Sequence, residues 1–283
     1  GNKKDKSKIS LFLNYSRGAE SGRDAWVYQS SNEKLKHNIE SMINFYNNNL
    51  TNGNNPIMDT TKISWTSSLL SSFEKKNNIT FDESLIRFSI YRPYQKQNLY
   101  FGGGLIHRVG QMPQIFPTSD TENLILYISG SSSSGKDFSV IITNIIPDLN
   151  MQHSGGQGFP LYLYEETTVK GNGADLFNHA QTKTADGKYI RKDAISDEGL
   201  KHFQDAYPTE TISKEDIFYY VYGLLHSEDY RSRYADNLTK ELPRIPCVKK
   251  TEDFWAFSKA GRDLAHWHLN YETVEPYKAK LDL

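Results

Sequence analysis

The sequence contains a single cysteine, Cys247, among its 283 residues. One thiol excludes an internal disulfide and any zinc site built from several cysteines, and it fits the reducing cytoplasm. Long apolar runs are also lacking, since no stretch approaches the roughly 18 apolar residues that cross a bilayer. The start, "GNKKDKSK", has basic residues but no apolar stretch after them, so it does not resemble a signal peptide. These absences predict a cytoplasmic protein without a membrane span.

A strong net charge is lacking as well. The formal net charge of −1 argues against an indiscriminate nucleic-acid binder, which would be strongly basic. The charges are unevenly placed, however. No acidic residue occurs between Glu83 and Asp120, whereas acidic residues far outnumber the lysines between Asp197 and Asp229. This distribution predicts a basic face in one region and an acidic face in another.

A complete phosphate-binding loop is lacking, although "GSSSSGKD" comes one residue short of it. The motif G-x-x-x-x-G-K requires Ser or Thr next, where this chain has Asp137. It also requires a helix afterwards, whereas "FSVIITNIIPDL" is β-branched and predicts a strand. We therefore expect a loop between two strands, with nucleotide binding through residues 130–137 as the enzymatic alternative.

Other catalytic signatures are lacking too. The sequence has no G-x-S-x-G, no H-E-x-x-H and no methylation motif of the N/D-P-P-Y/F type. His266 and His268 are two apart, so on a helix they point to different faces, and we expect at least one of them to pack. Cys247 has no evident base beside it. The chain is therefore expected to have no catalytic centre, no bound cofactor and no metal site of its own.

Helical periodicity is clear at both ends of the chain. In the first helix, at about 30–49, Ser30 and Glu33 predict a capping box, and the apolar face comprises Leu35, Ile39, Met42, Ile43 and Tyr46. Further helices are predicted over 65–76, from a cap formed by Ser213 and Asp216, over about 228–238, and over 258–268. A short strand is predicted at 25–28.

Between about residues 85 and 170 the period changes to two. "LIRFSIY" predicts a half-buried strand with Ile86, Phe88 and Ile90 on the inner face. "NLYF", "ENLILYIS", "FSVIITNII" and "FPLYLYEE" supply further strands, largely antiparallel because several connections are short. The predicted fold class is α+β, a central mixed or antiparallel sheet with N-terminal helices and a C-terminal helical subdomain. The expected segments are 1–84, a β-rich core at 85–170, and 171–283, which begins with a polar loop.

Long phrases of the sequence resemble one protein family. They include "ESGRDAWVYQSSNEKLKHNIESMINFYN", "IRFSIYRPYQKQNLYF", "PQIFPTSDTENLILYISG", "DIFYYVYGLLHSEDYRSRYADNLTKELPRIP" and "FWAFSKAGRDLAHWHLNYE". In order and content they are similar to the C-terminal region of Type ISP restriction–modification enzymes, from about residue 15 to 277. Related recognition regions occur in other restriction or phage-defence methyltransferases, which are an alternative assignment.

The resemblance implies a target recognition domain. In that family one polypeptide carries a nuclease, a helicase-like translocase driven by ATP and Mg²⁺, and an adenine-N6 methyltransferase that uses S-adenosylmethionine. Those activities and cofactors would belong to domains absent from this chain, which begins with Gly and is expected to be a piece of the longer enzyme. This piece would read double-stranded DNA while the neighbouring methyltransferase flips out an adenine.

Side chains suited to that role are dense in the acid-free segment. Groove reading uses Arg or Lys for guanine and Asn or Gln for adenine. The candidates there are Arg92, Gln95, Lys96, Gln97, His107, Arg108, Gln111 and Gln114. A second candidate loop, "QHSGGQG", contains Gln152, His153, Ser154 and Gln157, and Arg17, Arg23 and Lys36 are candidates for phosphate contacts.

Structural roles compete with these assignments. Arg92 is equally expected to pair with a buried acid, and Arg23 to form a local ion pair with Asp24. The main functional alternative is an interaction scaffold that braces methyltransferase against translocase, with base reading done elsewhere.

Overall fold

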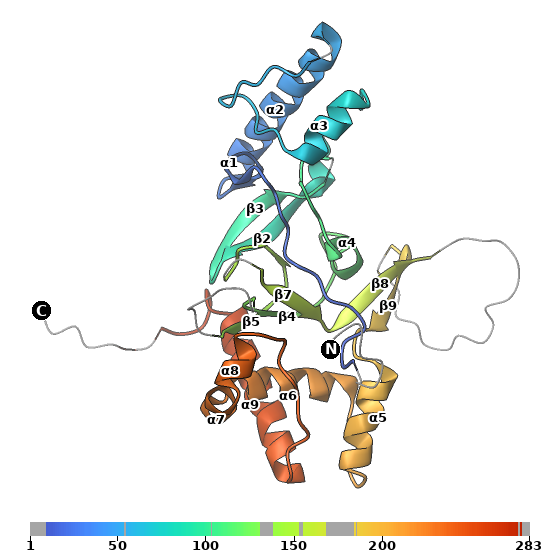
Figure 1. The fold of residues 1–283 in the computed structure, drawn as a ribbon, viewed down its shortest axis with the longest axis vertical. Helices are drawn as coiled ribbons and strands as arrows, with labels where there is room; N and C mark the ends of the chain where they lie inside the picture. Colours follow the sequence, from blue (N-terminus) through green and yellow to red (C-terminus); the bar gives the residue numbers. More distant parts are fainter. Residues whose placement is uncertain are drawn as a thin grey trace, which may run out of the picture.

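The computed structural model describes residues 10–53, 55–102, 104–130, 138–152, 155–167, 184, 186–276 and 278. Its helices are α1 (Asp24–Val27), α2 (Asn32–Asn52), α3 (Ser67–Glu74), the 3-10 turn η1 (Glu83–Leu85), α4 (Met112–Ile115), α5 (Asp197–Ala206), α6 (Lys214–His226), α7 (Glu228–Arg233), α8 (Ala235–Leu238) and α9 (Thr251–Leu269). Its strands are β1 (Tyr28–Gln29), β2 (Ile86–Arg92), β3 (Gln95–Tyr100), β4 (Ile125–Ile128), β5 (Val140–Thr143), β6 (Ile146–Pro147), β7 (Gln157–Pro160), β8 (Tyr162–Glu166) and β9 (Tyr189–Asp193). Along the longest axis, α2 and α3 occupy one end, the strands lie in the middle, and α5 to α9 occupy the other end (Figure 1). The predicted α+β class is confirmed.

Helix α2 forms where the apolar spacing predicts it. Its predicted face is buried, from Leu35 to Tyr46. The cap is Ser31 rather than Ser30, because the Ser31 side chain accepts the backbone N–H of Lys34. The helix also continues through the asparagine-rich stretch to Asn52. Asn49 is buried in this stretch, where its amide donates to the Phe45 carbonyl at 2.7 Å and accepts the Ile57 N–H at 3.0 Å.

The strands form three sheets rather than one. Their orders are β1-β3-β2-β6, β5-β4-β7 and β8-β9. All pairs are antiparallel except β2 with β6, where Ser89 lies opposite Ile146. The predicted antiparallel bias is therefore confirmed. "FPLYLYEE" supplies two strands, β7 and β8, and β9 is an element that the sequence did not predict.

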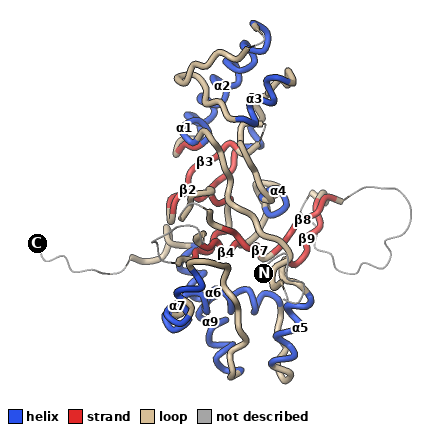
Figure 2. Tube along the Cα trace, in the orientation of Figure 1, coloured by secondary structure: helices blue, strands red, loops and turns tan. Residues whose placement is uncertain are grey.

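The middle sheet separates two hydrophobic cores. Along β4, Ile125 and Tyr127 belong to the core shared with α2 and α3, whereas Leu126 and Ile128 belong to the core shared with α5 to α9. This alternation is the period-two geometry of a strand that is buried on both faces. The helices α2 and α3 lie on one side of β4 and β7, and the helices α5, α6, α7 and α9 lie on the other (Figure 2).

Two predictions for the N-terminal half are wrong. The segment 25–28, predicted as a strand, is mainly the single helical turn α1, in which the Val27 N–H donates to the Arg23 carbonyl at 3.2 Å. Phe88, predicted to face the interior, is 63% exposed, while Ser89 is fully buried. Ser89 can be buried because its hydroxyl donates to the Ile146 carbonyl at 2.7 Å.

The C-terminal helices confirm one cap and correct two boundaries. Ser213 and Asp216 form the predicted capping box of α6. The predicted helix at 228–238 is divided at Tyr234 into α7 and α8. Helix α9 begins at Thr251, before the predicted start at Ser258, which lies inside the helix and donates to the Asp216 carbonyl at 3.0 Å.

Candidate functional site

The segment 14–20 crosses the middle of the molecule and is fixed by backbone pairs on both sides (Figure 1). Isolated bridges join Ser16 to Gly158, Ala19 to Asp148, and Glu20 to Arg108. Gly18 fits here because a Cβ at this position would collide with the Asp148 carbonyl group. The segment is therefore a rigid support for side chains, although it contains no regular helix or strand.

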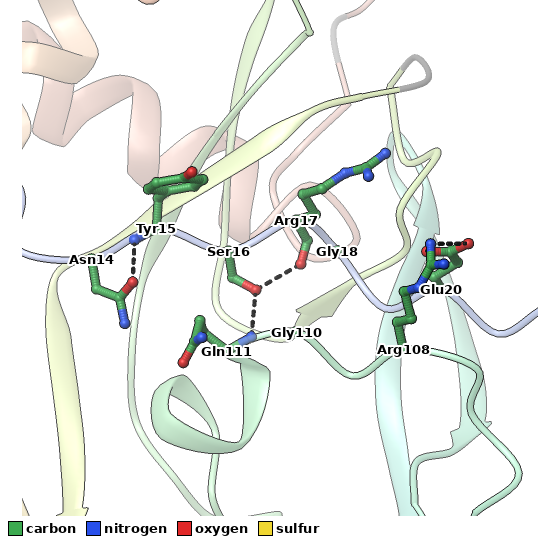
Figure 3. Close-up of a pocket in the computed structure, with 9 residues that line it drawn as sticks. All are labelled: Asn14, Tyr15, Ser16, Arg17, Gly18, Glu20, Arg108, Gly110 and Gln111. Carbon is green, nitrogen blue, oxygen red and sulfur yellow. Dashed lines mark hydrogen bonds and ion pairs between the residues drawn. The ribbon is translucent and has the colours of Figure 1, made fainter. Parts of the chain in front are cut away.

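A pocket of about 260 Å³ lies where this segment meets residues 108–111 (Figure 3). It is lined by Asn14, Tyr15, Ser16, Arg17, Gly18, Glu20, Arg108, Gly110 and Gln111. Gly110 has φ of 58°, and a Cβ there would lie 2.8 Å from the Ser16 Oγ. The turn is closed by that hydroxyl, which accepts the Gln111 N–H at 2.9 Å and donates to the Arg17 carbonyl at 2.7 Å.

Two arginines give the pocket its positive charge. Arg17 is exposed, and its guanidinium has no hydrogen bond or ion pair with the residues that the structure describes. Arg108 lies on the opposite segment, with its side chain 64% exposed, and its Nη1 donates to Glu20 Oε2 at 3.1 Å and to Oε1 at 3.3 Å. Figure 3 shows Arg108 and Glu20 pointing toward each other, while Arg17 points away from Gln111.

Amide side chains extend the pocket rim. Gln111 and Gln114 are both exposed. The Asn14 Nδ2 donates to Gln114 Oε1 at 3.4 Å, and the Asn14 Oδ1 accepts the Tyr15 N–H at 2.8 Å. Four sequence candidates, Arg17, Arg108, Gln111 and Gln114, therefore lie together, and we call them with Asn14 and Glu20 the pocket surface.

The candidates of the β2–β3 hairpin lie elsewhere and are mostly engaged. Arg92 donates to the buried Asp148 at 2.7 Å, so the pairing with a buried acid that the sequence left open is present. Burial raises the pKa of Asp148, and the ion pair with Arg92 opposes that rise. Lys96 pairs with Glu272 at 2.7 Å, beyond the end of α9. Gln95 is exposed and Gln97 is half-buried.

Arg23 and His107 support the fold from within. Arg23 is 3% exposed, and its guanidinium donates to the Leu105 carbonyl, to the Ser64 carbonyl at 3.1 Å and to Thr66 Oγ1 at 2.7 Å. Arg23 therefore does not form the local ion pair with Asp24 that the sequence suggested as its structural role. Burial lowers the pKa of Arg23 to about 10. His107 is half-buried, with Nδ1 3.0 Å from Ser68 Oγ.

The remaining candidates are separate from the pocket surface. Gln157 is half-buried in β7, opposite Ile128. The Gln152 amide is buried without a hydrogen-bond partner among the described residues. Ser154 and His153 lie outside the described residues, as do residues 131–137 of the serine-rich loop. Lys36 forms an ion pair with Glu83.

Sequence reasoning missed Asn14 and Glu20. Both are near Arg17 in the chain, but their partners Gln114 and Arg108 are 100 and 88 residues away. A local pattern cannot show such a pairing. The available signal was the cluster of polar residues in "NYSRGAE".

The chemistry of the pocket surface is that of binding. Arginines donate hydrogen bonds to anions and to planar polar edges, and side-chain amides both donate and accept them. Among the described residues, no group of three or more His, Cys, Asp or Glu could hold a metal ion. Within the same residues, no helix combines the length and apolar character that a membrane crossing needs.

As predicted, one histidine of "HWH" packs: His268 Nδ1 lies 2.5 Å from the Tyr222 hydroxyl.

Comparisons with known proteins agree on one family. The model of the Type ISP C-terminal specificity domain matches residues 10–282. Among solved structures, the chain is similar to the ATP-dependent Type ISP restriction–modification enzyme LlaBIII bound to DNA, with 34% identity and a TM-score of 0.82 over 97% of this chain. It is also similar to a DrdV–DNA complex, with 31% identity and a TM-score of 0.81 over 98% of this chain.

A third similar structure is a nuclease-deletion mutant of the Type ISP enzyme LlaGI with a DNA substrate mimic, at 29% identity and a TM-score of 0.76 over 95% of this chain. The chain spans 16%, 26% and 19% of the length of these three proteins. The comparison with curated proteins gives no match.

Proposed function

The chain belongs to the family of Type ISP C-terminal specificity domains, and we propose that it is the module that recognises a target sequence in double-stranded DNA. The observation that carries this proposal is the pocket surface. Two segments far apart in the chain bring Arg17, Arg108 and Gln111 to one pocket. Arginine and glutamine are the side chains that contact phosphates, guanine and adenine.

The rigidity of the pocket surface supports this role. DNA reading requires side chains that are held in register with the bases. The segment 14–20 has backbone bridges to β7, to the residue after β6, and to Arg108. Its side chains are therefore presented from a fixed frame. The similar solved structures are DNA complexes, which favours the same partner for this chain.

We further propose that the chemical steps belong to other parts of a longer polypeptide. Methyl transfer to adenine N6 from S-adenosylmethionine, and translocation driven by ATP and Mg²⁺, need sites beyond those that the described residues form. The neighbouring methyltransferase and helicase domains would then be intramolecular partners. The specificity module would select the site at which they act.

Binding to a pool of randomised DNA duplexes tests the proposal. The 283-residue chain would be incubated with the pool at about 50 and about 150 mM salt, and the retained duplexes sequenced, because phosphate contacts alone weaken steeply over this range. We expect one sequence motif to be enriched at both salt concentrations. Arg17→Ala/Arg108→Ala should bind at least about tenfold more weakly, given the usual size of such contacts.

A matched control removes the same charge elsewhere. Lys201 and Arg233 are exposed on α5 and α7, which lie in the helical end of the molecule, whereas the segment 14–20 crosses its middle (Figure 1). Lys201→Ala/Arg233→Ala should retain the motif and nearly the wild-type affinity. Binding that disappears at the higher salt, with no motif enriched, would reject sequence recognition and favour the scaffold role. Equal losses of DNA affinity in the two double variants would show that the pocket surface is not part of the DNA interface.

A further inference from the structure

The pair formed by Glu20 and Arg108 has a geometry beyond a simple surface ion pair. The two residues exchange both backbone hydrogen bonds, Glu20 N–H to the Arg108 carbonyl at 3.0 Å and Arg108 N–H to the Glu20 carbonyl at 2.9 Å. Their side chains then meet only through Nη1, which donates to both carboxylate oxygens. Both ends of the Arg108 side chain are thus fixed, although it is 64% exposed.

The rest of the Arg108 guanidinium is unoccupied. Nε and Nη2 have no hydrogen-bond partner among the described residues, and together they form one edge of the planar group. Such an edge can donate two parallel hydrogen bonds to the O6 and N7 acceptors of guanine. An arginine that is already oriented loses less side-chain freedom when it binds.

The charge of Glu20 is otherwise unfavourable in this place. A carboxylate on a DNA-contacting surface repels the phosphates and weakens binding to every sequence. Glu20 is only 26% exposed in its side chain, so its charge is held close to the pocket. If Arg108 only contacted a phosphate, it would not need the Glu20 carboxylate beside it. Orienting the Arg108 side chain gives the Glu20 charge a function.

We propose that Glu20 is a positioning residue that orients Arg108 for a bidentate contact with one guanine of the target. Arg17, for which the described residues supply no such partner, contacts a backbone phosphate and carries no sequence information. This division of labour rests on the proposed function. It assigns specificity at one base pair to Arg108 and general affinity to Arg17.

Four single variants in the randomised-pool assay test the division. Glu20→Gln removes the repulsive charge and loosens Arg108, so we expect tighter binding to unrelated duplexes but a preference for guanine at one position reduced by about tenfold. Arg108→Lys keeps the positive charge but loses the planar guanidinium with its two parallel donors, so the preference for guanine at the same position should weaken. Glu20→Asp keeps the carboxylate on a shorter side chain, so it should retain part of the preference for guanine at that position. Arg17→Ala should weaken all sequences alike and reduce the salt slope by about one.

The outcomes separate this inference from the function on which it rests. If wild-type protein enriches no motif, DNA target recognition itself fails. If wild-type protein enriches a motif but Glu20→Gln and Arg108→Lys leave every position unchanged, the orientation role is wrong while recognition stands. A uniform gain of affinity in Glu20→Gln would show that Glu20 only repels phosphate. Thermal unfolding of each variant, expected close to wild type, excludes loss of fold as the cause.

Discussion

Arginine has three different roles in this chain, and the surroundings of each side chain decide which. Arg23 is buried and donates to backbone carbonyls, Arg92 pairs with a buried carboxylate, and Arg17 is exposed with no ion-pair partner in the described part of the chain. A buried guanidinium needs all of its donors satisfied, so it cannot also serve a ligand. Only an exposed arginine with open donors is suited to contact DNA in the observed conformation.

The titration of His226 should affect the stability of the protein. Burial, with the positive charge of Arg231 and a contribution from His268, lowers the pKa of His226 from 6.5 to about 4. Its Nε2 is buried without a hydrogen-bond partner among the described residues. The folded state therefore resists a proton that the unfolded chain accepts, and the free energy of unfolding should fall as the pH falls from about 6.5 toward about 4.

Urea unfolding at a series of pH values measures this effect. We expect His226→Gln, which does not titrate, to lose less stability than wild type over that interval. Above about pH 7.5 the wild-type imidazole is neutral in both states, so the difference between the two proteins should become constant. The same pH slope in both proteins would show that other groups control the acid sensitivity.

At the scale of elements, the pair α6 and α9 depends on two glycines at the crossing. A Cβ on Gly261 would collide with the Tyr219 carbonyl, and one on Gly223 with the Phe257 carbonyl. The helices therefore approach so closely that backbone meets backbone, with Ser258 and Ala265 also buried in the contact face. Ser258, Gly261 and Ala265 follow one another at spacings of three and four, so small residues form the stripe at which the two helices cross.

Gly261→Ala should consequently destabilise the protein. Alanine favours an isolated helix by about 1 kcal/mol over glycine, but here the collision is with backbone, which puts the cost at the upper end of the about 1–3 kcal/mol that overpacking typically costs. The measurement is the free energy of unfolding in urea. Gly199→Ala in α5 is the matched control, since the nearest atoms to its added Cβ would be the end of the Leu11 side chain at 2.8 Å and the Ser196 hydroxyl at 3.0 Å, which are side-chain atoms, and the nearest backbone atom lies at 3.4 Å. Equal effects of the two substitutions would contradict close backbone packing.

At the scale of the whole molecule, β4 couples the two cores. Its alternate residues belong to opposite cores, so separating either core from the sheet exposes apolar side chains of the same strand. In the part of the chain that the structure describes, the strands lie between α2 and α3 at one end and α5 to α9 at the other (Figure 1). The shared sheet is therefore the structural basis for unfolding as one unit.

This coupling predicts a single unfolding transition. Val27→Ala in the first core and Ile217→Ala in the second should each lower the midpoint of the same transition, because both residues are fully buried. Near-ultraviolet circular dichroism and hydrogen exchange of β4 amides would follow it. Two separate transitions, each shifted by only one of the substitutions, would show that the cores fold independently.

The sequence by itself determined the elements that local periodicity encodes. Helices α2 and α6 and strands β2 to β5 follow from apolar spacing and caps within a few residues, since backbone geometry alone sets the periods of 3.6 and 2. Long phrases of the sequence also indicated the family, which the match over residues 10–282 confirms. The single cysteine and the absence of long apolar runs limited the classes of protein from the start.

Only the tertiary structure decided which side chains meet. It buried Arg23, exposed Phe88, paired Lys96 with Glu272 and brought Glu20 to Arg108 across 88 residues of chain. Composition and local spacing do not separate a structural arginine from an available one. The difference arises from distant partners and from burial. Those are properties of the folded chain, because a hydrogen bond or ion pair depends on distance in space and not on spacing in sequence.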